Sequence, residues 1–206
     1  MPFLFKRLVL FLSITAALAA DKEPAAFHAD PAPRYPHHQT NGKVTIAADP
    51  YVSGEKAQTA FGKLNPYEYG ILPVLVVIQN DGDKAIRLDR IEAVYTGPRG
   101  DKVEATPANE VRYLRGPKRP AVVPGPIGGL GIGKGKKNPL AAWEIEGRAF
   151  AAKMLPAGQS ASGFFYFQTG LQRGATLFVN HLADATSGEE LFYFEIPLEE
   201  SQQPNR

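Results

Sequence analysis

Short apolar runs and alternating apolar and polar positions dominate the chain after residue 43, and they predict β-strands. The strongest run is LPVLVVIQN, Leu72 to Asn80, which is rich in β-branched residues and bounded by Gly70 and by the polar turn NDGD. The alternation in KVTIAA, from Lys43, predicts a first strand. Further strands are predicted over KVEA, SASGFFYFQ, ATLFVNHLADA and ELFYFEIPL.

Three segments have other patterns. Ala85 to Tyr95, AIRLDRIEAVY, places apolar residues between charges with a one-residue slip, which predicts one half-buried strand with a bulge near Asp89–Arg90. A short helix is predicted near Glu55–Phe61. PANEVRYLRG predicts one or two helical turns, with Pro107 in the first helical position.

These short strands, with turns rich in Gly and Asp and little helix, predict an all-β antiparallel β-sandwich. LPVLVVIQNDGDKAIRL resembles the strand, Asn-containing turn and strand of secreted bacterial immunoglobulin-like domains of the telokin-like kind, and MLPAGQSASGFFYF is similar to a later element of those domains. The resemblance covers about residues 71–198 and implies an immunoglobulin-like sandwich. This chain departs from it in a Gly-rich basic insert at about 107–147, and the resemblance implies no catalytic residue.

The N-terminus has the three parts of a secretory signal peptide, predicted over residues 1–19. Lys6 and Arg7 precede an apolar run, and Ala17-Leu18-Ala19 is a small-residue cleavage site. The run is shorter than the roughly 20 residues that a membrane span needs. We therefore expect an exported protein of the periplasm or cell envelope with no transmembrane span in the mature chain. The rest divides into a disordered Pro/Ala/His-rich arm at 20–42, the sandwich domain at 43–198 and a polar tail at 199–206.

Composition removes several function classes. The absence of cysteine excludes disulfides, thiolate metal sites and a cysteine nucleophile. Without residues 1–19, the 23 basic residues fall to 21 and equal the 21 acidic ones. Seven cations nevertheless lie between Val111 and Pro139, a stretch without Asp or Glu. This segregation favours a local contact with an anionic partner over general affinity for nucleic acid.

The insert contains GGLGIGK, Gly128 to Lys134, which has the spacing of a phosphate-binding loop. Prolines precede it and Gly135, not Ser or Thr, follows the lysine, so neither a nucleotide nor another cofactor is predicted. Apolar residues beside cations suit an anionic lipid or polysaccharide surface. The alternative is a surface flap over the sheet edge. The candidate contact residues are Arg112, Arg115, Lys118, Arg119, Lys134, Lys136, Lys137, Ile127, Leu130 and Ile132.

No complete catalytic or metal-binding set is evident. Glu144 and Glu146 are predicted on one face of a strand, whereas a glycosidase needs two carboxylates on opposite sides of a bond. A Ser–His–Asp triad would need His181, and the remaining histidines, His28, His37 and His38, lie in the arm without a scaffold for a metal. The late aromatic blocks FFYF and FYF are predicted core, with stacking on a sugar or a partner as the alternative.

The sequence therefore predicts a non-enzymatic cell-envelope interaction module. Its expected partner is an unknown envelope protein or an anionic envelope surface, not a nucleic acid or a nucleotide. One alternative is a periplasmic carrier that holds a small apolar ligand between its sheets. A hydrolase is the less favoured alternative.

Overall fold

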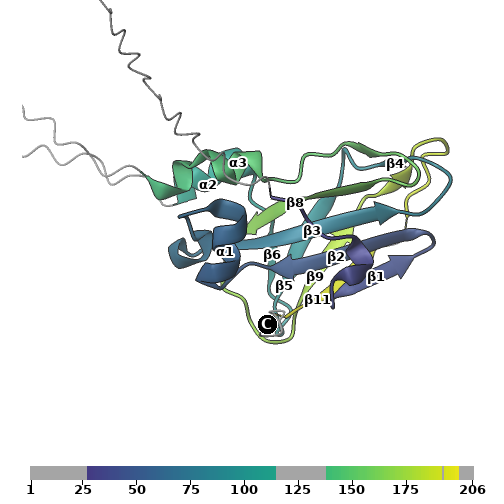
Figure 1. The fold of residues 1–206 in the computed structure, drawn as a ribbon. Helices are drawn as coiled ribbons and strands as arrows, with labels where there is room; N and C mark the ends of the chain where they lie inside the picture. Colours follow the sequence, from purple (N-terminus) through teal and green to yellow (C-terminus); the bar gives the residue numbers. More distant parts are fainter. Residues whose placement is uncertain (1–26, 115–137, 192, 200–206) are drawn as a thin grey trace, which may run out of the picture.

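The structure, a computed structural model, describes residues 27–114, 138–191 and 193–199. Within these ranges the protein is mostly β, with three antiparallel sheets and a small group of helices (Figure 1). The first sheet has the order β1-β2-β3-β8, the second β11-β9-β5-β6 and the third β10-β4-β7. The strands are β1 His38–Asn41, β2 Val44–Pro50, β3 Leu72–Asn80, β4 Ile86–Arg87, β5 Glu92–Thr96, β6 Lys102–Glu104, β7 Met154–Leu155, β8 Ser160–Phe167, β9 Ala175–Asn180, β10 Ala183–Asp184 and β11 Phe194–Leu198.

Short helices connect these strands. The α-helices are α1 Gly54–Phe61, α2 Ala108–Leu114 and α3 Trp143–Gly147, and the 3-10 helices are η1 Ala32–Arg34, η2 Pro66–Tyr69 and η3 Pro139–Ala141. The predictions of a strand over Leu72–Asn80, a helix near Glu55–Phe61 and a helical turn after Pro107 are confirmed. The Ser53 hydroxyl caps α1 by accepting from the Lys56 amide.

The first sheet lies between two hydrophobic cores, so the molecule has three layers. On β3, Val74, Val76 and Ile78 pack toward the second sheet. The alternate residues Leu75 and Val77 pack under the helices, together with Phe61 of α1. Because both faces of β3 are covered, its sequence is a continuous apolar run rather than an alternation. Figure 1 shows α1, α2 and α3 gathered at the end of the first sheet where β3 begins.

The prediction of one bulged strand over Ala85 to Tyr95 is wrong. Ile86–Arg87 forms β4 in the third sheet, whereas Glu92–Thr96 forms β5 in the second. A turn separates them, in which the Ile91 amide donates to the Leu88 carbonyl at 3.1 Å. The chain therefore changes sheets at the position where the apolar pattern slips.

The predicted disordered arm is wrong for the part that the structure describes, residues 27–42. His38–Asn41 pairs with β2 along its full length, and Ala32 in η1 is fully buried against the first sheet. The prolines do not prevent this, because Pro31 precedes η1 as its N-cap residue and Pro33 lies in its first turn, where proline is tolerated. β1 thereby covers the edge of β2 that would otherwise be unpaired.

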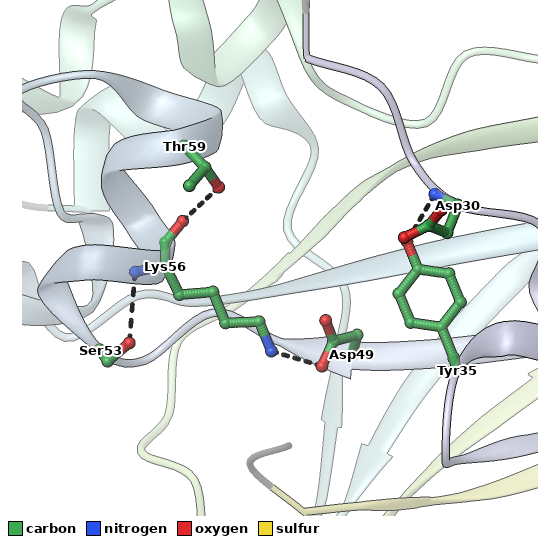
Figure 2. A network of polar contacts seen from close by, with 6 residues as sticks. All are labelled: Asp30, Tyr35, Asp49, Ser53, Lys56 and Thr59. Carbon is green, nitrogen blue, oxygen red and sulfur yellow. Dashed lines mark hydrogen bonds and ion pairs between the residues drawn. The ribbon is translucent and has the colours of Figure 1, made fainter. Parts of the chain in front are cut away.

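A buried ion pair fastens α1 to β2 (Figure 2). The Lys56 ammonium lies 2.5 Å from a carboxylate oxygen of Asp49, and the two side chains are only 11% and 7% exposed. The ammonium also lies 4.9 Å from the centre of the Tyr51 ring. Nearby, burial is the main cause that raises the pKa of Tyr35 to about 12. The Asp49–Lys56 ion pair is buried and joins β2 to α1, so we assign it a structural role.

Candidate functional site

The helices α2 and α3 pack against each other on either side of residues 115–137. The Asn138 side-chain amide donates to the Arg112 carbonyl at 2.7 Å, and the Arg112 guanidinium forms an ion pair with Glu146. Val111 and Ile145 are buried beneath them. The two points where the chain enters and leaves residues 115–137 are therefore held together by described contacts.

Two large aromatic side chains on this helix pair face solvent. Tyr113 on α2 is 72% exposed and Trp143 on α3 is 60% exposed. The Arg148 guanidinium lies 5.8 Å from the Trp143 ring, a cation–π contact. Tyr113 lies on the helix before residues 115–137 and Trp143 on the helix after them, so exposed aromatic residues and the basic stretch are close in the chain.

Only one of the candidate surface residues lies in the described part of the chain. Arg112 is paired with Glu146 across the two helices, so its charge serves an internal contact. The other candidates lie outside the described residues: Arg115, Lys118, Arg119, Ile127, Leu130, Ile132, Lys134, Lys136 and Lys137.

The prediction that Glu144 and Glu146 share one face of a strand is wrong. They lie in α3, where residues two apart point in different directions. His181, the histidine on which a catalytic triad would depend, has its ring nitrogens 3.2 Å from Glu190 and 3.5 Å from Glu92. Within residues 27–114, 138–191 and 193–199, no group of three or more His, Asp or Glu side chains has the geometry to hold a metal ion.

A half-open groove lies where the first and second sheets come together at one side of the molecule. We call it the edge groove; it encloses about 320 Å³. Its two sides come from β8, the last strand of the first sheet, and from β5 and β6 at the end of the second. The Thr106 amide donates to the Tyr166 carbonyl at 2.7 Å and joins the sides. Its wall between the sheets is apolar and includes Ile91, Ala105, Phe150 and Phe165, which pack against the core there.

The wall of the edge groove is fixed by backbone contacts. The Phe150 amide donates to the Phe164 carbonyl at 3.1 Å, and the Phe164 amide donates to the Arg148 carbonyl at 2.8 Å. A side chain at Gly163 would lie 2.4 Å from the Phe150 Cα, so only glycine allows this approach. The rings of Phe150 and Phe165 stack with their centres 5.4 Å apart. The groove is therefore preformed.

Sequence reasoning did not find the edge groove. Phe165 lay within a predicted core block, and Phe150 in a segment with no assigned partner. The pairing of residues 148–150 with β8 is a contact between distant parts of the chain, and no local pattern encodes it.

Comparisons with known proteins add general similarities. The chain matches no family model and no curated protein. Among solved structures, it is similar to the yjhA protein from Bacillus subtilis, with 16% identity, a TM-score of 0.46, and coverage of 80% of this chain and 98% of that chain. A second solved protein, the structural-genomics target SoR45, has 7% identity, a TM-score of 0.35, and coverage of 82% and 96%. No inference about function follows from similarities of this size.

Among residues 27–114, 138–191 and 193–199, no helix is long and apolar enough to cross a bilayer.

Proposed function

We propose that this protein is an exported, non-enzymatic interaction module of the cell envelope, built on an immunoglobulin-like sandwich. In this proposal, the α2–α3 pair and the basic residues 115–137 between the two helices contact an anionic surface. The single observation that supports it most is the exposure of Tyr113 and Trp143, which lie on the two helices on either side of residues 115–137.

The physical reason lies in the combination of side chains. Tyr and Trp have an apolar body and a polar tip, and they are enriched where one end of a side chain is buried and the other is wet. Each Lys or Arg near an anionic membrane surface contributes about 1 kcal/mol of attraction, which salt screens. The sequence supplies six cations and no acid over residues 115–137. Arg112 is not counted, because Glu146 neutralises it.

The test is co-sedimentation of the purified protein with vesicles that contain phosphatidylglycerol, at low and high salt. We expect binding at low salt, release at high salt, and little binding to vesicles of phosphatidylcholine alone. Reversing the charges of Lys134, Lys136 and Lys137 should abolish binding. The double variant Tyr113→Ala/Trp143→Ala should weaken it.

The matched control is Tyr193→Ala, which removes an exposed ring, 54% accessible, from a different part of the molecule. It should leave vesicle binding unchanged. The proposal fails if the charge-reversed protein binds as the wild type does, or if Tyr193→Ala and Tyr113→Ala/Trp143→Ala have equal effects.

A second candidate function has its own observation. The edge groove lies between the two sheets, as a carrier of a small ligand would require.

A further inference from the structure

We infer that the outer face of the second sheet binds a neutral pyranose sugar. A half-open depression of about 320 Å³ lies on this face, over β5, β6, β9 and β11; we call it the outer-face depression. Three features carry the inference: an aromatic wall, hydrogen-bonding groups around that wall, and charges that balance. The site is separate from the α2–α3 pair and does not depend on the surface contact proposed above.

Strand alternation places the side chains of the outer-face depression on the side of the second sheet that points away from the core. Phe178 of β9 lies opposite Val94 of β5 and, on its other side, opposite Glu195 of β11. Its neighbours along β9, Leu177 and Val179, are fully buried in the core that faces the first sheet. Phe178 is half-buried and Glu195 is exposed, so no described layer of the protein covers this face.

Phe178 and Tyr193 supply the aromatic surface. Their rings stack with the centres 4.9 Å apart and the planes at 28°. Phe178 lines the outer-face depression, and Tyr193, which is 54% exposed, extends the aromatic surface beyond it. The faces of a pyranose ring consist of C–H bonds, which pack on an aromatic ring while the hydroxyl groups point outward. This pair of rings therefore suits a sugar better than it suits a small ion.

The polar groups beside the aromatic wall match hydroxyl groups, which both donate and accept hydrogen bonds. Thr96 and Thr176 lie opposite each other on β5 and β9, and their own hydroxyls can do both. Asn180 also lines the depression, and its side-chain oxygen accepts no hydrogen bond within the described residues. That oxygen is buried, so we expect the Asn180 side chain to rotate as a sugar hydroxyl approaches. A hydrogen bond to the sugar would offset the cost of an unmet buried acceptor.

The charges of the outer-face depression favour a neutral ligand. Its lining contains one carboxylate, Glu195, and one ammonium group, Lys102, whereas Glu92 and Glu104 share the face but do not line it. β11 and β6 are the two edges of the second sheet, so their backbones lie three strand spacings, or roughly 14 Å, apart. Neither Glu195 nor Lys102 forms an ion pair with a described residue. Glu195 can accept from a hydroxyl and Lys102 can donate to one, but an ion of either sign would be repelled by one of the two.

The experiment is an NMR titration of the isotope-labelled whole protein at pH 6. The neutral probes are the methyl glycosides of glucose, galactose and N-acetylglucosamine. Methyl glucuronide is the anion, methyl glucosaminide the cation, and sorbitol an open-chain polyol. We expect at least one neutral glycoside to bind with millimolar affinity and to shift the amide signals of β5, β9 and β11. Sorbitol has hydroxyl groups but no ring to stack, so it should bind at least about threefold more weakly, and both charged glycosides should also bind more weakly.

Variants locate the site. Tyr193→Ala and Phe178→Leu should each weaken glycoside binding by about threefold or more, because each removes part of the aromatic surface. Asn180→Ala should weaken it by about twofold to tenfold, the value of one hydrogen bond. Thermal unfolding of each variant shows whether the fold is intact. The reciprocal control is Tyr113→Ala/Trp143→Ala, which removes exposed rings from the helix pair and should leave glycoside binding unchanged.

Several results would overturn the inference. They are an absence of shifts with all three neutral glycosides at millimolar concentration, shifts confined to α2 and α3, or a Tyr193→Ala protein that binds the glycosides as the wild type does. Sorbitol or a charged glycoside that binds as tightly as the neutral ones would overturn it as well. Vesicle binding in the Tyr193→Ala protein should be unchanged, so failure of this site and failure of the surface contact are distinguishable.

Discussion

The buried pair of Asp49 and Lys56 gives the sharpest prediction about stability (Figure 2). The change is Asp49→Ala, which removes the carboxylate but leaves the Lys56 ammonium in a site where its side chain is 11% exposed. Removing one partner of a buried pair costs about 3–5 kcal/mol, because a desolvated charge remains. The Tyr51 ring still faces the ammonium, so we expect about 3 kcal/mol.

A second variant tests whether the unpaired Lys56 charge causes the loss of stability. Asp49→Ala/Lys56→Met removes both charges and keeps most of the lysine stem, so the double variant should be more stable than Asp49→Ala alone. The exposed pair of Asp30 and Arg34, with side chains 66% and 73% accessible, supplies the control. Asp30→Ala should cost less than about 0.5 kcal/mol.

Urea unfolding followed by circular dichroism measures these free energies of unfolding. A loss of 3 kcal/mol corresponds to a fall in Tm of about 6–12 °C for a chain of this size. The reasoning is refuted if Asp49→Ala costs less than about 1 kcal/mol, or if the double variant is less stable than Asp49→Ala.

Four further predictions concern stability. Asn80 is 1% exposed and its amide donates to the carbonyls of Lys84 and Pro156, so Asn80→Ala should lower the free energy of unfolding by about 3 kcal/mol in a urea titration. Gly163→Ala should cost about 1–3 kcal/mol by the same measurement, because the new methyl group would meet the Phe150 backbone. Backbone amides of Ser187 and Thr186 lower the pKa of Asp184 from 3.8 to about 2. The stability that ionised Asp184 contributes is therefore present above pH 3.8 and is lost as the pH falls toward 2. Asp184→Asn should flatten the dependence of Tm on pH over that range. Burial raises the pKa values of Tyr35, Tyr51, Tyr95 and Tyr166, so their ionisation favours the unfolded state above about pH 10, and absorbance at 295 nm should show them titrating together with alkaline unfolding.

The strands that local pattern predicted are those with strong apolar sequences. β3 could be predicted because its apolar run, rich in β-branched residues, is too short for a typical helix and therefore favours a strand. α3 could not, because Trp143 to Glu146 alternates apolar and acidic residues over too short a span to separate a strand from a helical turn. By contrast, the pairing of His38–Asn41 with β2 is a local hairpin closed at Asn41 and Val44, and its Asn41-Gly42 turn was overlooked because of the prolines that precede it.

The candidate sites show the same division. The basic insert could be located from composition alone, because a cluster of basic residues without Asp or Glu can be recognised directly in the sequence. The aromatic block on β8 was predicted as core, and Phe164 and Tyr166 are buried under the helical layer on the far side of the first sheet. The edge groove depends on where residues 148–150 meet β8, which the sequence alone does not place.

The contact between Asn138 and Arg112 has a consequence for how this chain tolerates change in length. Because Asn138 and Arg112 are hydrogen-bonded to each other, the contact between α2 and the chain before α3 does not depend on the length of the segment that connects them. In general, doubling the length of a flexible connection costs only about 0.6 kcal/mol in closure entropy. We therefore expect that a peptide tag or a small domain inserted between Arg112 and Asn138 would leave the sheets undisturbed.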